Sequence, residues 1–259
     1  MAKFAAISLD DVSPATGYAV DRDVSGVQWS KLLSPAGYSL WLVVSTLADG
    51  AVLRWEAPHG DEAVCVLEGE LVVGDRRCPT GGALVVESGT VCEARAVGRT
   101  VVAHYGATDA EPPSDGVYGA PRADGHTVHV VGEKGWYLAG DGERYHAVWF
   151  ADSRCPTCRI SVFHVHSAGT DERELPHHHT QDEIIYVVSG EMRMGAHRYP
   201  AGTAISIPGN MRYALRGDGR PLSFLNYRRD ASMIQLADGG HPMLESGLAF
   251  NGVEVGDLR

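Results

Sequence analysis

Three histidines in succession, His177, His178 and His179, precede an acid at Glu183 in the stretch LPHHHTQDEIIYVVSGE, residues 175–191. Alternate residues of an extended strand point to the same face, so His177 and His179 share one face and His178 points to the other. After the short TQD turn, Glu183 can return to the face of the two outer histidines. Two imidazoles and one carboxylate on one face form a facial set that suits a divalent first-row metal with open positions. His177, His179 and Glu183 are therefore the candidate metal ligands.

The segments that must position these residues are short, rich in Val and Ile, and bounded by Gly, Pro, Asp or Ser. Examples are LWLVV, GALVVESG, RISVFHVH and GTAISIPG. Such segments are typical of β-strands joined by tight turns. Amphipathic helical periodicity is weak along the chain, so the predicted fold class is all-β.

The second half of the chain repeats the first, with Gly190 standing 121 positions after Gly69. Both copies read as an acid, an apolar strand, a Gly-Glu turn, a second strand, Gly, Arg-x-Pro and Gly. The matching pairs are Glu62/Glu183, Val66/Val187, Gly69/Gly190, Glu70/Glu191, Gly74/Gly195, Arg77/Arg198, Pro79/Pro200 and Gly81/Gly202. A module that occurs twice predicts two related β-domains in tandem.

A stretch rich in Pro, Gly and Asp, residues 107–125, separates the two copies. Its composition is typical of a linker. We therefore expect an N-terminal domain over residues 1–110, a linker over 111–134 and a C-terminal domain over 135–259. Small β-modules commonly protect their edges by closing into a barrel or pairing two sheets.

Two motifs in the second copy resemble those of the cupin superfamily. Residues 177–190 follow its first motif, a His-x-His pair, three residues, a Glu, six residues and a Gly. Residues 202–213 resemble its second motif, with Gly202 at the start and Pro208 in place. Together with the tandem copy, the resemblance covers about 35–110 and 155–231. It implies a bicupin with two antiparallel β-barrel, or jelly-roll, domains.

Two positions of the second motif depart from the cupin pattern. Asn210 stands where Gly is expected, which is tolerable because Asn also adopts left-handed turn conformations. Tyr213 replaces the fourth metal ligand, which is normally His. A neutral phenol is a poor ligand unless the ion removes its proton. Tyr213 can line the pocket of a three-ligand site as its catalytic residue, ligate as a phenolate, or fill space in a site that has lost its metal. We expect the first arrangement.

Further residues can line the same pocket. His164 and His166 lie two apart on a predicted strand and share one face, so they can reach the cavity and supply a fourth ligand or a general base. The alternative, which we prefer, is that they are half-exposed strand residues or hydrogen-bonded core histidines. Three apolar residues are expected to face the same side as Glu183 and Tyr213 and to complete the pocket: Ile185, Val187 and Leu215.

The first copy has lost most of the candidate ligands. At the same offset, the two histidines fall on Glu56 and Pro58, Tyr213 falls on Cys92, and only Glu62 is kept. Because proline has no ligating side chain, we expect a degenerate, metal-free N-terminal barrel.

The five cysteines are an odd number, which argues against a disulfide framework. Cys155 and Cys158 form a lone C-x-x-C. A structural zinc site would want a second pair, and a thioredoxin-like motif would want a βαβ context. A neutral structural pair or a disulfide is the preferred interpretation.

Composition restricts the function classes. The formal net charge of −11 argues against a nucleic-acid partner, which would require a basic stripe. No apolar run approaches the roughly 20 residues that span a bilayer, and the N-terminal stretch lacks the pattern of a secretory signal. We expect a cytoplasmic protein that acts on a small molecule, with a homodimer as the default assembly.

Three functions follow from the predicted site. The expected one is a small-molecule dioxygenase or related oxidoreductase with Fe(II), or with Mn, Ni, Cu or Zn in its place. The second is a non-oxidative metal-dependent isomerase, cyclase or lyase. The third is a cupin that binds a small ligand without catalysis.

Overall fold

The computed structural model describes residues 3–56, 58–108, 127–140, 145–152, 155, 157–169, 175–217, 219–229 and 232–236, and two short strands at 243–244 and 253–254. Strands make up almost all of the regular structure in these ranges, as predicted. One 3-10 turn, η1 (Leu9–Asp11), is the exception. No helix in these ranges is long and apolar enough to cross a membrane.

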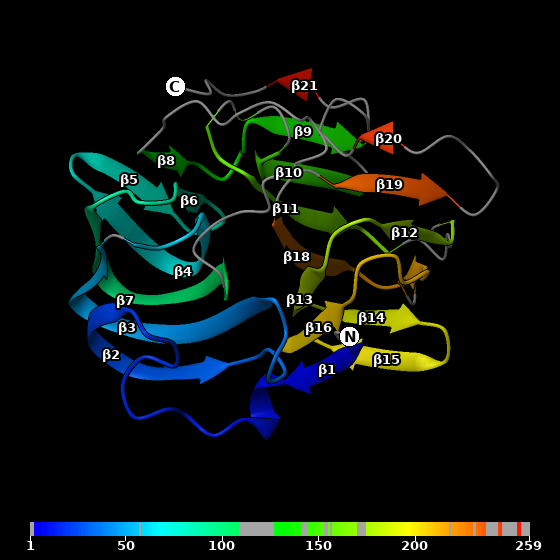
Figure 1. Ribbon diagram of the computed structural model, residues 1–259, viewed down its shortest axis with the longest axis horizontal. Helices are drawn as coiled ribbons and strands as arrows, with labels where there is room; N and C mark the ends of the chain where they lie inside the picture. Colours follow the sequence, from blue (N-terminus) through cyan, green and yellow to red (C-terminus); the bar gives the residue numbers. More distant parts are fainter. Residues whose placement is uncertain are drawn as a thin grey trace.

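The first barrel is built on a seven-stranded antiparallel sheet, drawn in blue to green in Figure 1. The sheet order is β2-β3-β7-β4-β6-β8, and β5 pairs with β4 at the side. The strands are β2 (Asp23–Leu32), β3 (Leu40–Trp55), β4 (Glu62–Val73), β5 (Arg76–Pro79), β6 (Ala83–Val86), β7 (Cys92–Ala107) and β8 (Val128–Val131).

The second barrel contains an eight-stranded sheet of order β1-β16-β13-β18-β11-β10-β9-β21 and two three-stranded sheets, β12-β19-β20 and β15-β14-β17. Its strands are β1 (Ala5–Ser8), β9 (Tyr137–Gly140), β10 (Tyr145–Ala151), β11 (Ile160–Ser167), β12 (His177–His179), β13 (Glu183–Ser189), β14 (Glu191–Met194), β15 (His197–Pro200), β16 (Thr203–Ile207), β17 (Leu215–Arg216), β18 (Leu222–Arg229), β19 (Met233–Leu236), β20 (Met243–Leu244) and β21 (Val253–Glu254).

The sequence repeat is present as a structural repeat. β4 and β13 begin at the equivalent residues Glu62 and Glu183, and β5 and β15 end at equivalent prolines. The repeated turn glycines also share a backbone conformation, with φ of 81° at Gly69 and 78° at Gly190. A Cβ at Gly190 would lie 2.2 Å from the Pro221 carbonyl oxygen, so this turn requires glycine for space as well as for φ.

Two strands pair across the domain boundaries that the sequence suggested. β1 belongs to the predicted N-terminal domain but pairs with β16 of the second barrel, Ala5 lying opposite Ser206. β8 falls within the predicted linker but pairs with β6 of the first barrel. The N-terminal segment therefore adds a strand to the second barrel, and the predicted linker adds one to the first. The chain segment 109–126 lies outside the described residues.

The barrels share a continuous apolar core. One cluster of buried residues extends from Leu33 and Tyr105 in the first barrel to Val162 and Tyr227 in the second. The rings of Tyr105 and Tyr227 stack with centroids 5.2 Å apart. Because burial of each large apolar side chain stabilises by about 1.5–3 kcal/mol, this shared core holds the two barrels in a fixed relation.

Candidate metal centre

The strand β12 has the predicted alternation. His177 and His179 are buried, with 2% and 3% of their surface exposed, whereas His178 is only partly buried. The two buried imidazoles lie with ring centroids 4.9 Å apart. Pairing with β19 holds the strand, with His179 opposite Ile234.

Tyr213 lies directly opposite His177. The two residues exchange both backbone hydrogen bonds, at 2.8 and 2.9 Å, and their ring centroids are 4.5 Å apart. The turn before Tyr213 depends on Asn210, whose φ is 64° and whose backbone N–H donates to the His179 carbonyl at 2.6 Å. The left-handed conformation predicted for Asn210 is confirmed.

Glu183 is buried at the start of β13, where it pairs across the sheet with Arg228 of β18. Its Oε2 accepts hydrogen bonds from Asn226 Nδ2 at 2.9 Å and from Arg228 Nε and Nη2 at 3.0 and 2.6 Å. Burial alone would raise the pKa of Glu183. The charges of Arg228 and His179 lower it, and hydrogen bonds from Tyr213 and Asn226 add to this effect. Together they outweigh burial, so the pKa of Glu183 lies below its ordinary value. The carboxylate is therefore ionised.

Arg228 connects two of the candidate ligands. Its side chain is 2% exposed, and its Nη2 lies 3.0 Å from His179 Nε2 as well as 2.6 Å from Glu183 Oε2. Arg228 and Asn226, which both lie on β18, were not among the residues predicted from the sequence. The charged pair Arg228-Arg229 at the end of the apolar run LSFLNY was the available signal, since a charge in a buried strand needs a partner.

The donor chemistry at this site fits a divalent ion, subject to one movement. Two imidazoles and an ionised carboxylate are buried together, and His177 Nδ1 contacts the Leu175 carbonyl at 2.9 Å, which directs its Nε2 to a ligand. The Arg228 guanidinium, however, occupies acceptor positions on Glu183 and His179 that a metal would use. Within the described residues, these three donors do not all lie within 4.8 Å of one another. An ion would have to displace the guanidinium from Glu183 and His179 before the three residues could hold it.

A small cavity of about 50 Å³ adjoins the site. Its polar lining comes from His177, His179, Tyr213, Asn226 and Arg228. Its apolar lining includes Leu215, as expected, and residues that the sequence did not single out: Ala147, Trp149, Phe163, Val165, Phe224 and Ile234. The expected pocket residues Ile185 and Val187 are fully buried but are not among the residues that line it.

His164 and His166 lie on the other face of β11, so they do not reach this cavity. Because side chains alternate along a strand, Phe163 and Val165 take the inward positions. The two histidines instead line a second cavity of about 300 Å³ between the barrels, together with His146. Burial and the charges of His166 and His146 lower the pKa of His164 to about 3, so His164 is neutral at ordinary pH.

In the first barrel, the retained Glu62 is also buried and ionised. Its Oε2 accepts from Trp55 Nε1 at 2.7 Å and His104 Nε2 at 2.8 Å, and its Oε1 accepts from Arg22 Nε at 2.9 Å. Its charge is balanced by protein groups. Absence of a metal from this barrel stays a prediction.

The first barrel also supports the site in the second. The Tyr38 hydroxyl donates to the backbone carbonyls of Glu183 and Ile207 at 2.9 and 2.7 Å, and Ser39 Oγ donates to Asp182 Oδ2 at 2.5 Å. The other oxygen of Asp182 accepts from the Gly209 N–H at 2.8 Å. These bonds fix the two turns that carry the candidate ligands.

No family model matches the sequence, and no curated protein matches it either. Solved structures of other proteins do match the fold of this chain. A mutant of Bacillus subtilis oxalate decarboxylase aligns over 90% of this chain and 79% of its own, with a TM-score of 0.65 and 15% identity. A structure of oxalate decarboxylase that describes its substrate binding mode aligns over 87% and 77%, with a TM-score of 0.61 and 16% identity.

A further structure concerns the Mn(II) centres of the Bacillus subtilis enzyme and aligns over 87% of this chain and 77% of its own, with a TM-score of 0.62 and 16% identity. At such low identity, the likeness is evidence about the fold and not about the reaction. The chain therefore has the fold of these oxalate decarboxylases, with two tandem cupin-like jelly-roll barrels.

Proposed function

We propose that the chain is a metal-dependent enzyme that acts on a small carboxylic acid in the cavity of the second barrel. The observation that carries this proposal is the convergence of two buried imidazoles, a tyrosine and the arginine that pairs with Glu183 on one small cavity with mostly apolar walls. Such cavities with few polar groups suit small ligands.

His177, His179 and Glu183 would hold the ion, with Mn(II) and Fe(II) as the first candidates. When bound, the ion would act as a Lewis acid and stabilise negative charge on an oxygen of the substrate. Glu183 is already ionised and needs no proton loss to serve as a ligand.

Arg228 gives the proposed substrate class. A guanidinium that leaves Glu183 stays beside the cavity, and its planar fork binds carboxylates through two parallel hydrogen bonds. The Asn226 amide, also in the cavity lining, can donate to the same carboxylate. The walls formed by Trp149, Phe163 and Phe224 exclude water and strengthen these charged hydrogen bonds.

A lyase-type reaction without net oxidation is favoured by the likeness to a decarboxylase with Mn(II) centres. The dioxygenase expected from the sequence is the second candidate, because two histidines and one carboxylate leave positions open on an ion.

Metal-loaded protein should be assayed with a panel of small carboxylic acids that includes oxalate, recording CO₂ release and net O₂ consumption. CO₂ without O₂ consumption supports the lyase, and O₂ consumed in step with product supports the dioxygenase. Metal-loaded protein without turnover of any acid would overturn the enzymatic proposal.

Ligation can be tested by three single substitutions in β12. His177→Ala and His179→Ala are each expected to weaken metal binding by at least about tenfold, because each removes a ligand. His178→Ala is the matched control, since His178 lies on the other face of the strand. Metal content per chain, measured by elemental analysis after dialysis, gives the result. Equal losses in all three variants would contradict this ligand set.

The role of Tyr213 can be tested by Tyr213→Phe, which removes the hydroxyl that donates to Glu183 and keeps the ring. If Tyr213 handles a proton, turnover should fall by about 10²-fold or more while metal content is retained. Metal analysis and turnover are measured on the same preparation. Loss of the metal together with the hydroxyl would instead indicate phenolate ligation.

A further inference from the structure

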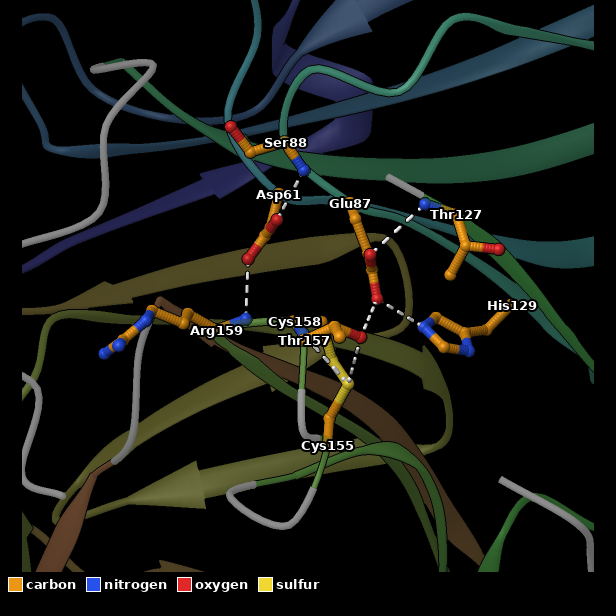
Figure 2. Close-up of a disulfide and its surroundings, with 9 residues drawn as sticks. All are labelled: Asp61, Glu87, Ser88, Thr127, His129, Cys155, Thr157, Cys158 and Arg159. Carbon is orange, nitrogen blue, oxygen red and sulfur yellow. Dashed lines mark hydrogen bonds and ion pairs between the residues drawn. A yellow bond between two sulfur atoms is a disulfide. The ribbon is translucent and has the colours of Figure 1, made fainter. Parts of the chain in front are cut away.

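A second group of donor atoms lies far from the candidate metal centre, where the two barrels meet. Cys155 and Cys158 occupy the turn before β11, and His129 lies on β8 of the first barrel. One donor atom from each of the three residues lies within 4.8 Å of the other two. Within the described residues, no other group of three His, Cys, Asp or Glu side chains meets this distance. Figure 2 shows the three residues converging from the two barrels.

The three residues are shielded from solvent. Cys155 and Cys158 are 7% and 5% exposed, and the His129 side chain is 10% exposed. The two cysteines form a disulfide in this structure. The Cys158 backbone N–H lies 3.0 Å from Cys155 Sγ, a placement that also stabilises a thiolate.

A buried carboxylate holds the histidine in place. Glu87 Oε1 accepts from His129 Nε2 at 2.7 Å and from the Thr157 hydroxyl, and its Oε2 accepts from the Thr127 N–H at 3.2 Å. Burial alone would raise the pKa of Glu87. The hydrogen bonds and the interaction with His129 outweigh burial, so the pKa lies below its ordinary value. Figure 2 shows that this same nitrogen, Nε2, faces the two cysteines, whereas Nδ1 lies on the far side of the ring, so a bound ion would take Nε2 in place of the Glu87 hydrogen bond.

This combination has the donor set of a thiolate zinc site. A Cys-x-x-Cys pair with one histidine gives three ligands, and a water can take the fourth position. From the sequence alone, the missing second cysteine pair argued against zinc. The fold supplies the third donor instead from a strand of the other barrel, 26 positions before Cys155.

We propose that the reduced chain binds a thiophilic divalent ion, Zn²⁺ first, through Cys155, Cys158 and His129, and that formation of the disulfide closes this site. A dithiol or phosphine reductant supplies two electrons, the S–S bond breaks, and two protons give two thiols. On binding the ion, the thiols release two protons and form two S–metal bonds. Oxidation by a disulfide or peroxide reverses the sequence and expels the ion.

The site would fasten the two barrels together. The segment around it already bridges them, because Asp61 of the first barrel accepts from the Ser88 N–H at 2.6 Å and from the Arg159 N–H at 2.5 Å (Figure 2). Both the disulfide and a bound ion would join Cys155 to Cys158. Only the ion adds a bond to β8 through His129.

The experiment uses the full chain with Co²⁺ as the probe, in a His177→Ala/His179→Ala background that removes the candidate ligands in the second barrel. After phosphine reduction under argon, one equivalent of Co²⁺ should produce thiolate-to-cobalt charge-transfer absorption, and Zn²⁺ should displace it. Chain left oxidised should give no such absorption.

Substitutions test the two cysteines and the histidine. Cys155→Ser/Cys158→Ser should abolish the absorption, and Cys92→Ser, which changes a free cysteine outside the group, should keep it. His129→Ala is expected to weaken Zn²⁺ binding by at least about tenfold, because it removes the third ligand. The proposal is overturned if the reduced chain shows no thiolate–cobalt absorption, or if Cys155→Ser/Cys158→Ser retains it. Neither result would count against the proposed metal site at His177 and His179, because both histidines are absent from the protein used here.

Discussion

Arg228→Met is expected to destabilise the metal-free protein by about 3–5 kcal/mol, the range for removing one partner of a buried ion pair. The substitution removes the guanidinium that balances the charge of Glu183, and methionine cannot replace its hydrogen bonds to that carboxylate. Both partners are almost fully buried, so solvent cannot compensate. Urea unfolding of the metal-free variant and of the wild type measures the difference.

A divalent metal should restore much of this loss. In the variant, an ion can balance Glu183 without first displacing a guanidinium, so Mn²⁺ should raise the melting temperature more in Arg228→Met than in the wild type. Arg198→Met is the matched control, because Arg198 pairs with Glu191 at the surface with 57% of its side chain exposed. Such surface pairs contribute about 0–1 kcal/mol. A loss in Arg228→Met no larger than in the control would show that the pair does not stabilise the barrel.

Much of the fold was predictable because the repeat constrains it. Equivalent turn glycines at 69 and 190 mark the same turn in both copies, and the alternation of β12 placed His177 and His179 on one face. The left-handed Asn210 was predictable because residues 202–213 resemble a motif in which glycine stands at this position. These features depend on local sequence.

Features that depend on long-range pairing were not predictable. Arg228 reaches Glu183 through the register of β18 against β13, 45 positions apart, which no local pattern encodes. The spacing of His164 and His166 showed that they share one face of β11. It could not show that this face borders the cavity between the barrels and not the cavity at the candidate metal centre, because that depends on how β11 packs. Likewise, His129 meets Cys155 only because β8 crosses to the first barrel.

Glu62→Gln should destabilise the first barrel by about 3 kcal/mol near neutral pH. Burial raises the pKa of Glu62, but hydrogen bonds and charges from His104 and Arg22 lower it from 4.5 to about 2. A lowering of this size corresponds to about 3 kcal/mol of stability that the ionised carboxylate contributes. Glutamine cannot accept from all of the donors around Glu62, and its NH₂ group faces Trp55 or His104 as a second donor.

The pH dependence of the effect distinguishes the charge from simple packing. Because the pKa in the folded protein lies below its ordinary value, the contribution of Glu62 is fully present above about pH 4.5 and is lost as the pH falls towards 2. The difference in unfolding free energy between wild type and Glu62→Gln should therefore shrink over that range. Glu68→Gln, at an exposed pair with Arg99, is the control and should change stability by at most about 1 kcal/mol. A difference for Glu62→Gln that stays constant between pH 5 and pH 3 would mean that the ionised carboxylate does not stabilise the barrel.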